Sequence, residues 1–369
     1  MSKSINFSLL LILSLIFYSC NNDDEIVNVK ESSSILPVNK VPKYNNGIFF
    51  ISSELGIDSK INFFNIKDNS FEEIYSSKKS HIASIDGDNN YYYISSQRVD
   101  DSGSNSVIVK DLQTFKDVRT ITTNLNFPKK VISFSDKLFI VNNDDPNLLD
   151  TKPFISVFTK TKTKNTFIKK IDLPENTRAE KMKVLGNKLY IVSRPPNFLL
   201  SQSIIVFNLQ NEQIEANITN ISNFKPDIDD LESYEDNMYF SIKPRRGIFT
   251  SNPKKREIYK FSGTKLNLAY EITNPKNVGE TSIMLNYRSN FYITSGKFIY
   301  KQIPGNKNLE LTYTNNKIFR FLHFLTSTEV LILDTTNKLT IKKINDSSEP
   351  KKLIDFINRD VNSIELFKL

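Results

Sequence analysis

The sequence of 369 residues is poor in several residue types whose scarcity limits its chemistry. It contains one cysteine, so no disulfide can form within the chain. It contains two histidines, His81 and His323, which argues against a zinc or iron site built from histidines. From the sequence we predict no bound metal and no cofactor.

Aromatic residues, in contrast, are abundant. The chain has 27 phenylalanines and 15 tyrosines, and 39% of its residues are hydrophobic. A disordered chain lacks the apolar surface needed to offset its conformational entropy, so this composition excludes disorder. The length is enough for one large or two ordinary domains with a sizeable core.

The formal net charge is +8 at pH 7, and the pI is about 9.1. Lysine is spread along the whole chain rather than gathered in one segment, as expected from an AT-rich genome. A nucleic-acid binder concentrates its basic residues on one face or element. We therefore predict no nucleic-acid partner.

The first twenty residues have the pattern of a secretory signal. A basic start precedes an apolar run over 7–18, and that run is too short to span a bilayer, which takes about 20 residues. The segment ending at Cys20, Ile-Phe-Tyr-Ser-Cys, resembles a bacterial lipobox, in which the thiol is acylated. We expect 1–19 to be a lipoprotein signal peptide and Cys20 the lipidated residue. An ordinary signal peptide with a chance cysteine is the alternative.

An acidic cluster, Asn-Asn-Asp-Asp-Glu over 21–25, follows directly. It resembles the surface-export signal of Bacteroidetes lipoproteins, which implies display on the outer leaflet of the outer membrane. A solvated tether that happens to be acidic is the alternative. Residues 20–44 are expected to form the lipidated cysteine and a flexible linker.

The rest of the chain repeats about every 47 residues, a spacing typical of one four-stranded propeller blade. Each repeat contains a short apolar strand, such as 47–50, 91–94 and 188–191. Tight polar turns at 135–136, 186–187 and 235–236 join most of these strands to a preceding one. The pattern predicts an all-β, seven-bladed β-propeller over 45–369. Six or eight blades are the alternatives.

The first repeat lacks its leading strand, and the chain ends on an apolar alternation over 364–369 that has no second strand after it. The simplest arrangement places this last strand in the first blade. Such a strand would close the ring and remove the open sheet edges that promote aggregation.

Two predicted strands, Lys-Leu-Tyr-Ile-Val (188–192) and Ile-Ile-Val-Phe-Asn-Leu (204–209), resemble the repeated strand pattern of the YncE-like propellers of Bacteroidetes lipoproteins. The resemblance covers nearly all of the folded body. Some members of that group lie over a TonB-dependent transporter and capture cobalamin, and similar propellers capture iron-siderophore complexes. The resemblance therefore implies capture of a ligand at the cell surface, but it assigns no binding residue.

The connections between second and third strands are long in repeats two to five, over 95–105, 141–153, 192–203 and 241–256. Long ordered loops on a rigid scaffold often carry binding, so we predict one functional face. Arginines and aromatics are the expected anchors of its rim. The predicted binding residues are Arg194, Phe198, Arg245, Arg246 and Phe249 on these loops, and Phe127 and Phe224 on loops that enter the same face.

No enzyme constellation is apparent. The sequence has no nucleophile elbow, phosphate loop or cysteine–base pair, and without tryptophan it lacks the docking pattern of quinoprotein propellers. The oxygen-rich segments 142–145 and 227–230 could help to hold calcium, but neither has the spacing of a calcium loop, and a capped turn explains both. The segment 86–90 looks like a calcium motif but falls at a turn between first and second strands, so we predict no metal there. We expect a non-enzymatic surface lipoprotein that captures a ligand or docks on a TonB-dependent transporter. The alternatives are an interaction scaffold without a small ligand and an enzyme acting on a surface polysaccharide.

Overall fold

The computed structural model divides the chain into two units, Met1–Asn39 and Lys40–Leu369. All described residues belong to the second unit. They are 42–54, 58–78, 80–99, 104–144, 152–161, 164–195, 202–219, 226–244, 256–263, 265–272, 282–303, 306, 309–344, 351–356 and 360–367. Within these ranges, no helix is long and apolar enough to cross a membrane.

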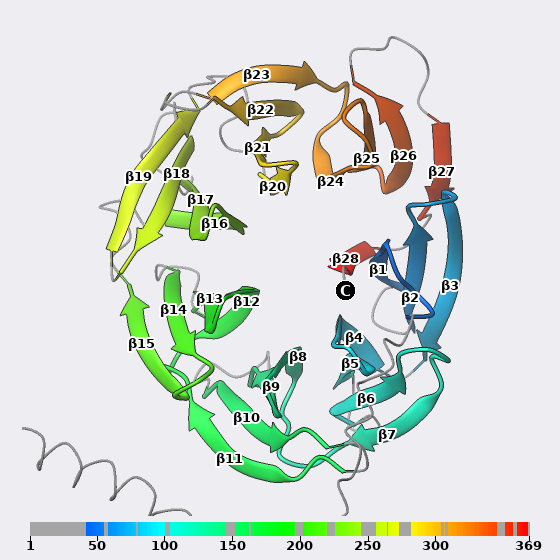
Figure 1. The fold of residues 1–369 in the computed structure, drawn as a ribbon, viewed down its shortest axis with the longest axis vertical. Helices are drawn as coiled ribbons and strands as arrows, with labels where there is room; N and C mark the ends of the chain where they lie inside the picture. The colour runs from blue at the N-terminus through cyan, green and yellow to red at the C-terminus, as the bar shows by residue number, and fades with distance from the viewer. Residues whose placement is uncertain are drawn as a thin grey trace, which may run out of the picture. The chain divides into compact units, whose positions relative to one another are not determined.

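The second unit is a ring of seven four-stranded antiparallel sheets, which confirms the predicted seven-bladed β-propeller (Figure 1). We number the blades along the chain and give the strands of each from the centre of the ring outward. Blade 1 consists of β28 (Asp360–Phe367), β1 (Gly47–Glu54), β2 (Asp58–Asn65) and β3 (Ser70–Ser77). Blade 2 consists of β4 (Ser80–Gly87), β5 (Tyr91–Arg98), β6 (Ser106–Asp111) and β7 (Asp117–Ile121). Blade 3 consists of β8 (Pro128–Phe134), β9 (Lys137–Asn142), β10 (Phe154–Thr159) and β11 (Phe167–Asp172).

The remaining four blades follow the same order. Blade 4 consists of β12 (Arg178–Leu185), β13 (Lys188–Arg194), β14 (Ser203–Asn208) and β15 (Gln213–Ile218). Blade 5 consists of β16 (Pro226–Tyr234), β17 (Asn237–Pro244), β18 (Arg256–Ser262) and β19 (Lys265–Ile272). Blade 6 consists of β20 (Met284–Tyr287), β21 (Asn290–Ser295), β22 (Phe298–Gln302) and β23 (Leu309–Thr314). Blade 7 consists of β24 (Phe319–Phe324), β25 (Glu329–Asp334), β26 (Lys338–Lys343) and β27 (Lys351–Asp355).

The C-terminal strand closes the ring, as predicted. β28 pairs antiparallel with β1, from Gly47↔Phe367 to Ser53↔Asp360, and serves as the innermost strand of blade 1. The strand begins at Asp360, four residues before the predicted start at Ile364. With β28 in place, blade 1 has its fourth strand and the circle of blades is complete.

The core consists of clusters that lie between neighbouring blades. Among the described residues there are seven such clusters, one at each blade interface. In β1, Phe49 and Ile51 pack toward blade 2, whereas Ile48 and Phe50 pack toward blade 7. Because successive side chains of a strand point to opposite faces, a sheet buried on both faces needs an uninterrupted apolar run. The short apolar strand of each repeat is therefore apolar throughout because both of its faces are buried against neighbouring blades.

The two faces of the ring differ in their connections. Since strands alternate in direction, the connections from second to third strands and from each blade to the next lie on one face, which we call the loop face. The hairpin turns lie on the opposite face, the turn face. There Gly186, Glu235 and Asp236 take positive φ angles of 59°, 46° and 56°, as tight hairpins require.

The chain enters the propeller on the turn face, where Tyr44 is buried. The hydroxyl of Tyr92 accepts a hydrogen bond from the Tyr44 N–H at 3.1 Å and donates one to the Tyr44 carbonyl at 2.9 Å. The Lys43 N–H donates to the Leu112 carbonyl at 2.9 Å. The segment that precedes β1 is thus fixed to the wall of blade 2.

Candidate functional site

The loop face carries long connections in four adjacent blades. By the strand bounds, the second-to-third connections of blades 2 to 5 span 99–105, 143–153, 195–202 and 245–255, against 55–57, 296–297 and 335–337 in the other three. These bounds reproduce the asymmetry expected from the sequence. The site described below is built from the inner strands and from the described ends of the long connections.

A β-bulge interrupts the inner strand close to the loop face in at least six of the seven described blades. In each, one extra residue lies opposite a single residue of the second strand. The extra residues are Ala83, Lys129, Glu180, Asp229, Arg320 and Asn362. Bulges reorient side chains and are common next to functional sites. Four of these six residues are charged, and all lie near the loop-face ends of the inner strands, which together we call the mouth.

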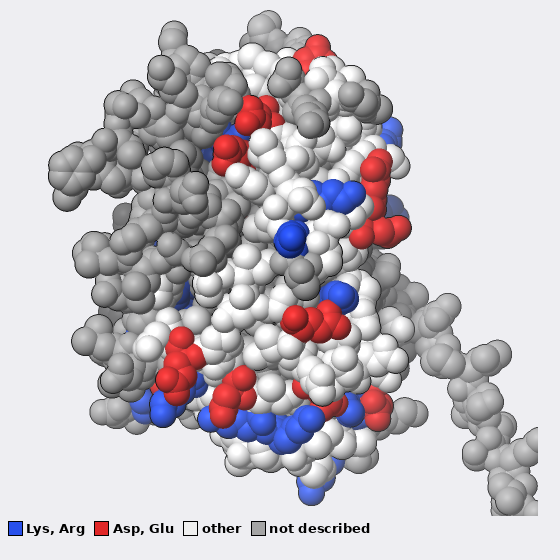
Figure 2. Space-filling view, turned by 90° about the vertical axis from the view of Figure 1, so that its left-hand side faces the viewer, with Lys and Arg blue, Asp and Glu red and all other residues white. Residues whose placement is uncertain are grey.

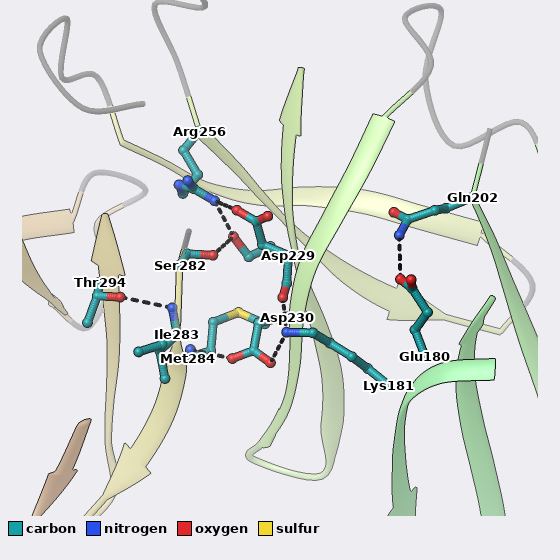
Figure 3. Close-up of polar contacts among 11 residues, drawn as sticks. Glu180, Lys181, Gln202, Asp229, Asp230, Arg256, Ser282, Ile283, Met284 and Thr294 are labelled. Atoms are coloured by element: carbon teal, nitrogen blue, oxygen red, sulfur yellow. Dashed lines mark hydrogen bonds and ion pairs between the residues drawn. The ribbon is translucent and has the colours of Figure 1, made fainter. Parts of the chain in front are cut away.

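In blade 4, the bulge residue Glu180 is linked to the end of the long connection (Figure 3). Gln202, which immediately precedes β14, donates a hydrogen bond to the Glu180 carboxylate at 3.1 Å. The side-chain oxygen of Gln202, Oε1, accepts a hydrogen bond from the Ile228 N–H of blade 5. One amide side chain therefore ties the returning end of the connection both to its own blade and to the next.

In blade 5, Arg256 occupies the equivalent place (Figure 3). Its side chain is fully buried and forms an ion pair with the bulge residue Asp229, whose side chain is 7% exposed. The guanidinium also donates to the Ser241 hydroxyl at 3.2 Å, and Ser241 shares a 2.6 Å hydrogen bond with Ser282, just before blade 6. A buried charge is tolerated when it is paired and hydrogen-bonded, as it is here.

Two further carboxylates join neighbouring inner strands. Asp230 accepts a hydrogen bond from the Met284 N–H of blade 6 at 2.7 Å and lies 3.5 Å from the Lys181 ammonium of blade 4 (Figure 3). In the same way Asp86 accepts from the Val131 N–H at 3.1 Å and pairs with Lys130 at 3.0 Å. These carboxylates satisfy backbone donors on the inner edge of the next blade and fix the spacing of the blades.

Of the predicted binding residues, the structure describes Arg194 and Phe127. Arg194 ends β13 with a side chain that is 45% exposed, and its Nε lies 2.8 Å from the Glu180 carboxylate. Phe127 immediately precedes β8, is half-buried, and has the Arg98 guanidinium 5.5 Å from its ring centre. Both lie on the loop face, as predicted, but on different blades. Phe198, Phe224, Arg245, Arg246, Phe249 and the proposed lipidation residue Cys20 lie outside the described residues.

The oxygen-rich segments serve as structural contacts where they are described. Asp229 and Asp230 pair with cations, and Asn143 binds the backbone of Ala179. Among the described residues, no group of three or more histidine, cysteine, aspartate or glutamate side chains could hold a metal ion.

His81 lies on β4 at the loop face, one residue before the buried Ile82. Burial lowers the pKa of its imidazole, and the nearby charge of Lys129 lowers it further. The imidazole of His81 therefore stays neutral at a lower pH than an ordinary histidine does. His323 lies on β24, where its ring stacks on that of Phe321 at 6.4 Å.

A small hollow of about 160 Å³ lies at the two outer strands of blade 3, lined by Asn124, Leu125, Phe154, Phe167 and Lys170. Sites for drug-sized molecules usually measure about 300–1,000 Å³. This hollow is therefore too small to enclose a large ligand.

Charges of both signs alternate on the side of the ring shown in Figure 2. Lys188 pairs with Glu215 at 2.7 Å, and Glu212 pairs with Lys137 at 2.5 Å and Lys169 at 2.6 Å. Burial by itself would raise the pKa of Glu212, but the two lysines lower it below its usual value. Over the described residues of this side, lysines and arginines are interspersed with acidic residues rather than gathered into one basic area.

Comparison with known proteins places the chain among β-propellers. No known family model and no curated protein sequence matches it. Two solved structures from Bacteroides fragilis and Bacteroides uniformis, both provisionally assigned as 6-phosphogluconolactonases, are similar with a TM-score of 0.55 each. Their identities are 11% and 13%, over 88% and 87% of this chain and 99% of each of theirs. A hypothetical selenium-binding protein from Sulfolobus tokodaii has a TM-score of 0.58 at 8% identity, over 87% of this chain and 93% of its own. At these identities the likeness establishes the fold alone.

Proposed function

We propose that the loop face of blades 2 to 5 is a binding surface that captures a ligand or docks on a partner protein. The observation that carries the proposal is the attachment of the long connections to the inner strands. Gln202 and Arg256 each fasten the returning end of a connection to a bulge carboxylate, Glu180 and Asp229. Binding loops need a rigid scaffold beneath them, and these contacts provide one.

We further propose that the protein is a lipoprotein of the outer membrane, anchored through Cys20 and exposed at the cell surface. The lipobox-like segment and the acidic residues after it support this localisation. The chain enters the propeller on the turn face, next to the buried Tyr44.

The partners we propose are a TonB-dependent transporter and a large ligand such as a cobalamin or an iron-siderophore complex. They follow from the resemblance to propeller lipoproteins and from the exposed Arg194 and half-buried Phe127 at the mouth. A planar cation and an aromatic ring are frequent anchors of recognition surfaces. A scaffold that binds only protein would use the same face.

We propose that the protein is not an enzyme, although two similar Bacteroides structures are provisionally assigned as lactonases. The described carboxylates of the mouth already have positioning contacts. Glu180 binds Arg194 and Gln202, Asp229 binds Arg256, and Asp230 binds Lys181 and a backbone N–H. A general base needs instead to reach a substrate proton.

A thermal-shift screen of residues 21–369 tests the binding function. The panel contains cobalamins, haem, siderophore complexes and glycans, with 6-phosphogluconolactone hydrolysis assayed in parallel. A ligand at a hundredfold its Kd stabilises the fold by about 2.7 kcal/mol. We expect one class to stabilise the protein and the double variant Arg245→Ala/Phe249→Ala to lose the effect. Unchanged binding in that variant would show that the rim is assigned wrongly, and lactone turnover would replace capture with catalysis.

A further inference from the structure

We propose that the hollow at the outer strands of blade 3 binds a small aromatic carboxylate, that is, one phenyl-sized ring that carries a carboxylate group. The five residues that line it are Asn124, Leu125, Phe154, Phe167 and Lys170. They belong to β10, to β11 and to the connection from β7 to β8, and none of them takes part in the contacts of the mouth. The inference therefore goes beyond the proposed function and does not depend on it.

The volume of the hollow matches a single six-membered ring. It measures about 160 Å³, and an apolar cavity of about 150 Å³ holds one benzene molecule. Asn124 is exposed and the Lys170 side chain is 47% exposed, so the hollow opens to solvent. A ring can therefore enter from outside and leave a polar substituent at the opening.

Apolar side chains form one part of the lining. Leu125, Phe154 and Phe167 are all half-buried. The ring of Phe167 packs against that of Phe158, with the ring centres 5.6 Å apart and the planes at 69°. Leu125 and Phe167 also pack against the core between blades 2 and 3, which holds them in place. Aromatic rings attract one another in edge-to-face and offset arrangements, so this lining favours an aromatic ring over an aliphatic group of the same size.

Lys170 supplies the charge of the lining. Its Nζ lies 4.5 Å from the centre of the Phe154 ring, which places the ammonium beside the apolar wall. It also pairs with Asp172 at 3.0 Å, and the Asp172 side chain is 75% exposed. Exposed ion pairs contribute little to stability. A ligand carboxylate can therefore take the place of Asp172 while its ring fills the hollow.

Asn124 adds a neutral hydrogen-bonding group. Its backbone has a positive φ of 57°, a conformation that asparagine tolerates. The Asn124 carbonyl accepts a hydrogen bond at 2.5 Å from the hydroxyl of Ser156, which is fully buried. This contact fixes the residue at the hollow, where its side-chain N–H groups can donate to a carboxylate oxygen. Hydrogen bonds to a charged acceptor are stronger than neutral ones, so the amide favours the same ligand as Lys170.

Titration of residues 21–369 with benzoate tests the inference by methyl NMR, because Leu125 lines the hollow and its signals report where the ligand binds. Benzyl alcohol has the ring without the charge, and acetate has the charge without the ring. At constant ionic strength, we expect benzoate to shift the Leu125 methyl signals with a Kd at least about threefold lower than that of either control compound.

The test variant is Lys170→Gln, and the matched control is Lys164→Gln, which removes the same charge from an exposed residue at the turn face of the same blade. The Kd of benzoate should rise at least about threefold in the test variant and remain nearly unchanged in the control. The Kd of benzyl alcohol should be nearly the same in both. Asn124→Gly, which suits the positive φ, should weaken benzoate binding to a smaller extent.

Melting curves establish that each variant is folded. Equal weakening of benzoate by Lys170→Gln and Lys164→Gln would overturn the inference, because it would reduce the effect to net charge. Equal Kd values for benzoate and benzyl alcohol would overturn it too, since the charge would not be recognised. Unchanged Leu125 signals at about 10 mM benzoate would also overturn it, because a ligand of this size that fits its site should bind at that concentration. None of these results bears on the loop face, which the ligand panel tests separately.

Discussion

Replacing Arg256 with methionine removes the fully buried cation that holds the returning end of the longest connection of blade 5. The change leaves the Asp229 carboxylate, 7% exposed, without its ion-pair partner. Breaking a buried pair by removing one partner costs about 3–5 kcal/mol, since the remaining charge stays out of water. The Ser241 hydroxyl also loses its 3.2 Å contact with the guanidinium.

The expected loss is measurable by heat or urea denaturation. For a unit of this size, Lys40–Leu369, the entropy of unfolding is about 0.7 kcal/mol/K, so the midpoint should fall by about 4–7 °C. The double variant Asp229→Asn/Arg256→Met removes both charges and should recover most of the loss, because well-packed neutral groups often replace a buried pair at little cost. If the single variant melts within 1 °C of the wild type, the pair does not support the connection and our account of the site is wrong.

Three further changes test other parts of the structure. His81→Gln should remove a loss of stability in acid, measured by urea melts at pH 7 and pH 5. The pKa of His81 in the folded protein lies below the usual value of about 6.5, so the unfolded chain binds the proton first and the wild type loses stability as the pH falls below about 6.5. Gly47→Ala should destabilise by about 1–3 kcal/mol in urea melts, since the added Cβ would lie 2.1 Å from the Phe63 ring. Tyr92→Phe should cost about 1–3 kcal/mol and speed exchange of the Tyr44 amide, because it removes the hydroxyl that pairs both of that residue's backbone groups.

Each of these three predictions has a contradicting result. A His81→Gln variant that loses as much stability in acid as the wild type would assign the effect to other groups. An unchanged melt of Gly47→Ala would mean that the Phe63 ring and the Phe64 carbonyl, which would lie 2.1 and 2.5 Å from the added Cβ, can both move aside without cost. Tyr313→Phe provides the control for Tyr92→Phe, because the Tyr313 hydroxyl is buried without a hydrogen-bond partner in the described part of the chain. Equal losses in the two tyrosine variants would contradict a specific role for Tyr92.

The fold could be predicted from the sequence because its signal is local and repeated. Each run such as Ile48–Ile51 must bury both faces between two blades, and the demand recurs in every repeat. Closure by the last strand was predictable for the same reason, since blade 1 lacked one strand. Its true start at Asp360 was missed, because the bulge that puts Val361 opposite Ser52 breaks the period-two alternation.

The contacts beneath the candidate site could not be predicted in this way. Asp229 suggested an oxygen-rich segment, yet its partner Arg256 lies 27 residues later, beyond the whole connection. Gln202 and Glu180 are likewise separated by 22 residues. Only the register of the strands shows that Gln202 and Arg256 occupy equivalent places in adjacent blades. Arg194 was predicted from its place in a long second-to-third connection; the structure puts it at the end of β13 with a 45% exposed side chain, and its binding role stays a prediction.

Hydrogen exchange of residues 21–369, with and without the panel ligand that stabilises the protein most, tests the binding face most directly. We predict slower exchange at the starts of β8, β12 and β16 and in the connections above them. Exchange around the turn-face residues Gly186 and Asp236 should not change. Slowing confined to the turn face, with the starts of these three strands unaffected, would contradict the assignment of the loop face as the binding surface.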